Sequence, residues 1–104
     1  MLPIHLLEPH EIDLVKRSLQ AAASGPFFPD WEFDTLFGLS RDDLRSVAAS
    51  WPENAAEPET EAAVHNTLAN LSGYPHKREQ DLERMLAVAP TALRELIQKL
   101  DTAE

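Results

Sequence analysis

The residues with the greatest capacity for chemistry lie in the run HNTLANLSGYPH, from His65 to His76. Asn66 and Asn70 are four residues apart, so a helix would carry both amides on one face, and Asn is unfavourable inside a helix unless its amide has a task. Together with Tyr74 these amides could line a polar recess in which the His76 imidazole transfers protons. The amides could equally satisfy backbone groups of a neighbouring turn or loop.

A second candidate is the run GPFFPDWEFDTLFG (residues 25–38), which holds five of the seven aromatic residues. Large rings carry much apolar area, so a short helix capped by Asp30 and ended by Gly38 would bury most of them as the plug of a small core. Alternatively, one or two rings stay exposed and anchor a protein partner. Folding could also bring Asp30 or Glu32 to the polar recess. The binding residues of the partner hypothesis are Phe28, Asp30, Trp31 and Glu32.

Motifs for metal binding and for common catalytic chemistries are missing from the sequence. Asp30, Glu32 and Asp34 alternate as in a calcium loop, but the turn glycine and the terminal bidentate acid of that loop are lacking. The four histidines show no HExxH spacing, there is no cysteine, no serine stands in a GxSxG context, and three glycines cannot build a phosphate loop. We therefore expect no metal and no cofactor, and name no catalytic residue; a small enzyme or ligand-binding domain built on the polar recess is the alternative function.

The charge of the chain bears on the kind of partner. Eighteen acidic residues against nine basic ones give a net charge of −9, which disfavours nucleic acid and anionic membranes. No Lys or Arg lies between Arg17 and Arg41 or between Arg45 and Lys77, and seven acids fall in these two windows. The leading hypothesis is a non-enzymatic regulator or inhibitor, of the immunity or antitoxin type, that binds a basic protein. The alternative is that the excess acid only confers solubility. The oligomeric state is left open.

The N-terminal run MLPIHLLEPHEID has no basic leader and meets Pro and acid too soon for a signal sequence or a membrane span. Without cysteine, the chain cannot form disulfides. Both observations favour a cytoplasmic protein.

Helix starts occur three times, in LEPHEI (7–12), LSRDDL (39–44) and VAPTAL (88–93). Each places one apolar residue before the N-cap and another at the fourth helical position, which is a hydrophobic staple. A further helix opens on the acids of EPE and closes at Gly73. A weaker helical pattern covers 77–87.

These elements predict an all-α fold, a compact single domain of four or five short helices over residues 1–104, with a loose tail at 100–104. Two very short extended segments, at 2–7 and 86–88, could pair with each other. The predicted core consists of Ile12, Val15, Leu19, Leu36, Phe37, Leu44, Val47, Trp51, Val64, Leu68, Leu71, Leu93, Leu96 and Leu100.

The runs FFPDWEFDTLFGLSRDDLRSVAASWP and NTLANLSGYPH resemble a group of short bacterial proteins of unassigned function. The shared features are the aromatic and acidic stretch, the following Trp-Pro and the Asn-rich helix that leads to Gly-Tyr-Pro-His. The likeness covers the central part of the chain and implies one compact family domain. It brings no activity, cofactor or catalytic residue.

Overall fold

The computed structural model describes residues 4–73, 77–88 and 90–103, and over these ranges the protein is helical without a strand. It forms one compact all-α domain, as predicted, but the described ranges hold six α-helices rather than four or five, because the weak pattern at 77–87 does contain a helix. The elements are the 3-10 helix η1 (Ile4–Leu6) and the α-helices α1 (Pro9–Ser24), α2 (Asp30–Phe37), α3 (Arg41–Ser50), α4 (Pro58–Gly73), α5 (Glu79–Leu86) and α6 (Pro90–Ala103).

The predicted helix starts at α1 and α3 are confirmed by their capping bonds. The backbone N–H of Glu8 donates to Glu11 Oε1 at 2.8 Å, which is half of a capping box. The Ser40 hydroxyl accepts the N–H of Asp43 at 3.1 Å. Helix α2 ends at Gly38, as predicted, and its φ of 72° is the left-handed conformation that glycine adopts without strain. The predicted Asp30 cap is wrong, because Pro29 occupies the N-cap position and Asp30 is the first helical residue.

Two local predictions are wrong. Residues 4–6 form a 3-10 helix rather than an extended segment, and Leu86 completes α5, so the described residues of the two segments do not pair as strands. A two-stranded ribbon would have buried little, whereas local helical hydrogen bonds form without a partner. Helix α6 also continues to Ala103, through part of the predicted loose tail, because Leu96 and Leu100 are buried and hold it against the core.

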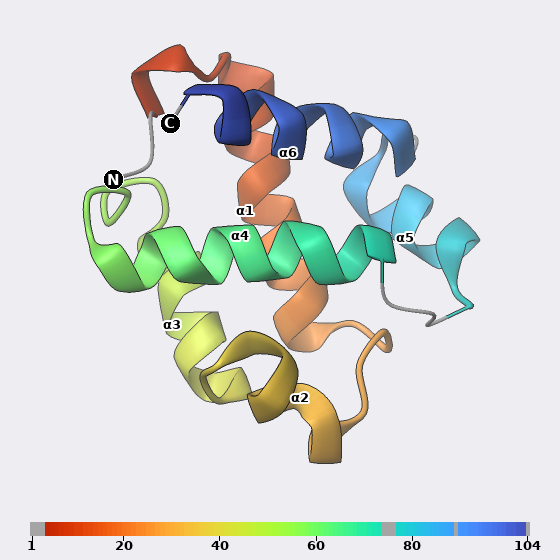
Figure 1. Ribbon diagram of the computed structural model, residues 1–104. Helices are drawn as coiled ribbons and strands as arrows, with labels where there is room; N and C mark the ends of the chain where they lie inside the picture. Colours follow the sequence, from red (N-terminus) through yellow and green to blue (C-terminus); the bar gives the residue numbers. More distant parts are fainter. Residues whose placement is uncertain (1–3, 74–76, 89, 104) are drawn as a thin grey trace.

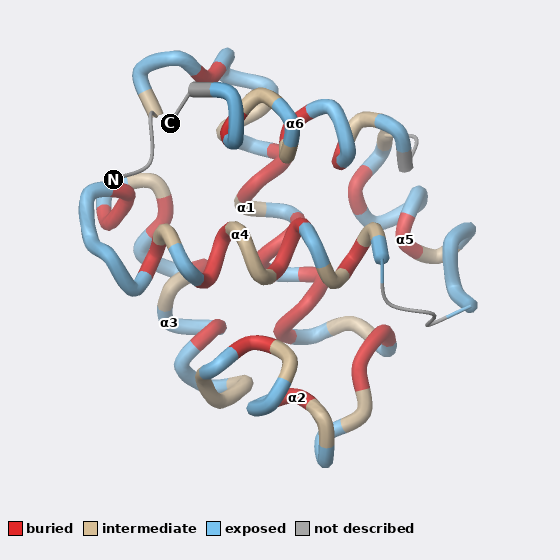
Figure 2. Tube along the Cα trace, viewed as in Figure 1, coloured by how far each residue is buried: buried red, intermediate tan, exposed pale blue. Residues whose placement is uncertain are grey.

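Helices α1 and α4 make up the centre of the domain. Helix α1 packs on α3, α4 and α5, and α4 packs also on α2, α3 and α6. Figure 1 shows α4 crossing in front of α1, and in Figure 2 the buried parts of both helices gather at this crossing. The predicted core residues are buried there, except that Ile12, Leu36 and Val47 are half-buried at the edge of the core.

The connection after α3 is held to α1 through Trp51. Its side chain is buried, and Nε1 donates to the carbonyl oxygen of Ile12 at 2.9 Å. Lys16 Nζ in turn donates to the carbonyl oxygen of Trp51 at 3.1 Å. These two bonds hold the start of the segment between α3 and α4 against α1.

An ion pair joins the first and last long helices. Lys99 Nζ on α6 lies 2.6 Å from Glu11 Oε1 on α1, and the Glu11 side chain is only 16% exposed. Burial by itself raises the pKa of Glu11, but the backbone N–H of Glu8 and the ammonium of Lys99 outweigh it and lower the pKa below the ordinary value of 4.5. The ionised form of Glu11 is therefore favoured in the folded protein.

We expect Glu11→Gln to lower the free energy of unfolding by about 1 kcal/mol at neutral pH, because the neutral amide loses the pair with Lys99 but can still accept from Glu8. Because the pKa of Glu11 is lower in the folded protein than in the unfolded chain, ionised Glu11 stabilises the fold at pH values above its unfolded-state pKa. This stabilisation is lost as the pH falls through its folded-state pKa. The difference between wild type and variant should therefore shrink below pH 4.5 in urea titrations at several pH values.

The matched control is Asp13→Asn, which removes an exposed pair with Arg17 within α1 (2.8 Å). It should change stability by less than about 0.5 kcal/mol. A Glu11→Gln difference that stays constant down to acid pH would contradict the role given to the ion pair.

No helix in the described ranges is both long and apolar enough to cross a membrane.

Candidate functional site

The aromatic stretch is mostly core. Phe27, Phe28, Phe33 and Phe37 are each at most 5% exposed. The Phe28 ring meets the Phe37 ring edge-on at a centroid distance of 5.0 Å, and Phe33 and Phe37 stack at 4.4 Å. Phe28 is thus a packing residue of the core, and its ring is not available as the partner contact proposed from the sequence.

Trp31 is the exception, because its side chain is 79% exposed. Phe33 and Phe37 are four residues apart and share one face of α2, whereas Trp31 precedes Phe33 by two positions and points to the opposite side. Of the predicted binding residues in this stretch, Trp31 therefore remains as an exposed aromatic surface.

Asp30 has a structural partner, Arg41 of α3. Arg41 Nη2 lies 2.8 Å from Asp30 Oδ1 and donates to the carbonyl oxygen of Phe28 at 3.0 Å. Its Nη1 donates to the carbonyl oxygen of Ala23 at 3.1 Å, and the guanidinium lies 4.4 Å from the centre of the Phe33 ring. One side chain thus joins the end of α1, the connecting loop and α2.

The three acids of this stretch do not form a calcium loop. They lie within the helix α2, where Asp30 and Asp34 share a face and the half-buried Glu32 lies on another. In the ranges that the structure covers, no group of three or more His, Asp or Glu side chains could hold a metal ion.

The two asparagine amides of α4 cap the end of α2. Asn66 Nδ2 donates to the carbonyl oxygen of Phe37 at 3.1 Å, and Asn70 Nδ2 donates to those of Leu36 at 3.2 Å and of Asn66 at 2.8 Å. The last carbonyls of a helix have no partner within it, so these amides supply donors that α2 lacks. These hydrogen bonds support the alternative that the amides of Asn66 and Asn70 satisfy backbone groups of a neighbouring segment.

Tyr74 and His76, the other two members of the predicted polar recess, lie outside the described residues. Of the described members of the recess, Asn66 and Asn70 already donate their amide N–H groups to backbone carbonyls, and Asp30 is paired with Arg41.

A groove of about 710 Å³ opens beside this contact, between the end of α2, the helix α3, the segment 51–57 and the start of α4. Such a volume lies in the range of natural ligand-binding clefts. We call it the acidic groove, because three carboxylates and no basic residue occur among its described lining residues. Its lining includes the acids Asp43, Glu57 and Glu59, the apolar residues Phe37, Leu39, Val47 and Ala62, and the amides Asn54 and Asn66.

The carboxylates of the acidic groove come from two helix starts. Asp43 lies in the first turn of α3, Glu59 lies in the first turn of α4, and Glu57 directly precedes α4. The positive ends of the helix dipoles partly offset their mutual repulsion. Within the chain as described, none of the three has an ion-pair partner. The site was missed at the sequence level, although the basic-free interval from Arg45 to Lys77 marks part of it.

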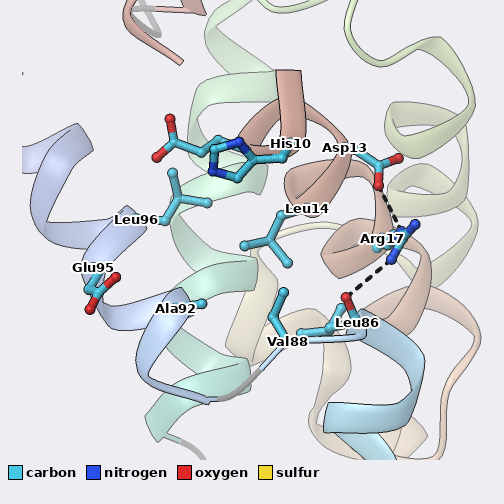
Figure 3. A pocket seen from close by; sticks show the side chains of 10 residues that line it. His10, Asp13, Leu14, Arg17, Leu86, Val88, Ala92, Glu95 and Leu96 are labelled. Atoms are coloured by element: carbon cyan, nitrogen blue, oxygen red, sulfur yellow. Dashed lines mark hydrogen bonds and ion pairs between the residues drawn. The ribbon is translucent and has the colours of Figure 1, made fainter. Parts of the chain in front are cut away.

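A second, smaller cavity of about 310 Å³ lies between α1, α5 and α6 (Figure 3). Leu14, Val88 and Leu96 face one another across it, and Arg17 closes one side. Arg17 Nε lies 2.8 Å from Asp13 Oδ2 and Nη1 donates to the carbonyl oxygen of Leu86 at 3.3 Å. Of the acids in its lining, Asp13 is paired with Arg17 and Glu11 with Lys99, so among the described residues this cavity offers a ligand fewer unpaired carboxylates than the acidic groove.

Comparison with protein families, with curated proteins and with solved structures yields no match to this chain. The likeness to short bacterial proteins stays a hypothesis, and the function has to be argued from the geometry.

Proposed function

We propose that this protein is a non-enzymatic binding protein, a regulator or inhibitor of the immunity or antitoxin type, that presents the acidic groove to a basic protein. The observation that carries the proposal is the set of three carboxylates, Asp43, Glu57 and Glu59, which line one open groove and have no internal cation within the described structure. The electrostatic free energy of each carboxylate is lower when a positive charge from a partner lies beside it than when only the other two carboxylates do.

The overall charge supports the same kind of partner. A net charge of −9 attracts a basic protein over several ångströms and speeds its association, more strongly at low ionic strength. Trp31 adds an exposed aromatic surface on α2, the residue type that contributes most per contact at protein interfaces.

We expect the triple variant Asp43→Asn, Glu57→Gln, Glu59→Gln to lose a specific partner that the wild-type protein captures from a host lysate at low salt. Removing three charges at the rim of an interface should weaken binding roughly tenfold or more. High salt should release the same partner from the wild type, since it screens the charges. The measurement is the amount of each protein retained, followed by titration of the purified partner.

The matched control is Glu79→Gln, Glu83→Gln, Glu95→Gln, which changes the net charge equally at exposed positions on α5 and α6. This control should retain the partner. Equal loss with both triple variants would show that bulk charge alone attracts basic proteins, and retention by both would remove the acidic groove from the interface.

A further inference from the structure

Trp31 is the most exposed large apolar side chain in the described structure, with 79% of its surface open to solvent. It lies in the first turn of α2, on the side away from the Phe33 and Phe37 rings that pack into the core. Its ring contacts no other ring among the described residues. Both the apolar area and the π electrons of the indole are therefore open to a partner.

The acid Asp34 lies beside Trp31 on the outer surface of α2. The two residues are three positions apart, which places their Cβ atoms about 5–6 Å from each other on a helix. Asp34 is exposed and has no ion-pair partner among the described residues. Arg41, the cation that packs on α2, is paired with Asp30 instead. An aromatic ring and an unpaired carboxylate thus share one exposed face.

We propose that Trp31 and Asp34 together receive one cationic side chain, arginine or lysine, of the basic partner. The cation lies over the face of the indole ring, whose π electrons attract positive charge, and pairs with the carboxylate of Asp34. Tryptophan attracts cations more strongly than the other aromatic side chains. This assignment rests on the proposed function and adds a contact on α2 to the acidic groove.

A second copy of this chain fits the same face poorly. In a two-fold dimer each surface meets its own equivalent, so two Asp34 carboxylates would face each other without a cation between them. Helix α2 contains three acids and no basic residue, and every copy carries a net charge of −9. Like charges of this size repel, whereas a basic partner is attracted. Charge complementarity therefore favours a basic partner over self-association.

The test uses an acetylated tetra-arginine peptide amide, with the neutral isostere tetra-citrulline as its control. Binding to the isotope-labelled full-length protein is followed by two-dimensional NMR at low salt, where each indole N–H gives its own signal. We expect the Trp31 signal to shift and saturate with tetra-arginine and to stay nearly unchanged with tetra-citrulline. The signal of Trp51, which is 1% exposed and donates to the carbonyl oxygen of Ile12, should not move.

Asp34→Asn and Trp31→Ala change exposed side chains, so both variants should keep the wild-type midpoint in urea titrations. Asp34→Asn should weaken tetra-arginine binding at Trp31 about threefold, the size expected for one exposed ion pair. Glu83→Gln removes the same charge at an exposed position of α5 and should leave this affinity unchanged. In the double variant, read from the backbone signal of Thr35, the loss should be smaller than the product of the single losses, because both contacts act on one cation.

An unmoved Trp31 signal, an equal shift with tetra-citrulline, or equal losses in Asp34→Asn and Glu83→Gln would overturn the assignment. If tetra-arginine then shifts only the backbone signals of the acidic groove, the groove is the cation site and the proposed function stands. A Trp31 shift that survives in the triple variant of the groove would support a separate contact on α2. The lysate capture decides the proposed function independently of these outcomes.

Discussion

Replacing Arg41 with Met is expected to lower the free energy of unfolding by about 2–4 kcal/mol, because several charge-assisted bonds are lost at once. The guanidinium side chain is only 20% exposed and donates to the carbonyl oxygens of Ala23 and Phe28. These acceptors would be left without that donor in a partly buried place. The contact with the Phe33 ring, at 4.4 Å from its centre, is lost as well.

Urea unfolding followed by circular dichroism measures this change. Arg45→Met is the control, since Arg45 lies one turn further along α3, is 51% exposed and pairs only locally with Asp42 in the described structure. It should cost less than about 0.5 kcal/mol. Arg41→Lys should remain destabilised, because an ammonium cannot reproduce the planar fork that reaches several acceptors. Similar costs for Arg41→Met and Arg45→Met would refute the joining role of Arg41.

Truncation of Leu68 to Ala is expected to destabilise the protein by about 2–5 kcal/mol, because the removed methyl groups leave a cavity in a closely packed core. Leu68 is 1% exposed and belongs to α4, the helix that packs on α1, α2, α3 and α6. A domain of this size has a total stability of roughly 5–15 kcal/mol, so the variant would lose a large share of it.

The same urea titration can be applied to Leu6→Ala as a control, because Leu6 is 45% exposed and gives up little burial. Its cost should stay below about 1 kcal/mol. If Leu68→Ala were as mild as Leu6→Ala, the packing of α4 at the centre of the domain would be wrong.

Leu68 and Arg41 both support helices that line the acidic groove. Leu68 holds α4, which carries Glu59, and Arg41 opens α3, which carries Asp43. A partner-binding experiment on either variant therefore needs a folded fraction measured in parallel, whereas the groove variants change exposed or loop side chains and leave this frame in place.

Helix positions could be predicted because their signals are local. The capping residues Glu8 and Ser40 act within one turn, and the apolar stripes of α1, α3, α4 and α6 repeat at helical spacing, so a few neighbouring residues suffice. The prediction was weakest for 77–87, where polar residues open α5 and only Leu82 and Leu86 are buried.

The candidate site was predicted less well, since its parts meet only in the folded chain. The sequence marked Asn66 and Asn70 as a pair on one helix face, but their acceptors, the last carbonyls of α2, lie 29 and 34 residues away. The stretch 25–38 holds so many aromatic rings that the sequence alone could not show which of them would be exposed. Packing buried Phe28 and left Trp31 in solvent.

The sequence by itself determined the helical class, most helix boundaries, most of the large fully buried side chains and the acidic balance, because these depend on composition and on contacts within one or two turns. The tertiary structure alone decided that Arg41 joins α1 to α2, that Lys99 pairs with Glu11 across 88 residues, and that the acids of α3 and α4 face one groove with Asn54. These contacts join residues far apart in the sequence, so they depend on how distant helices cross, which no local pattern of residues specifies.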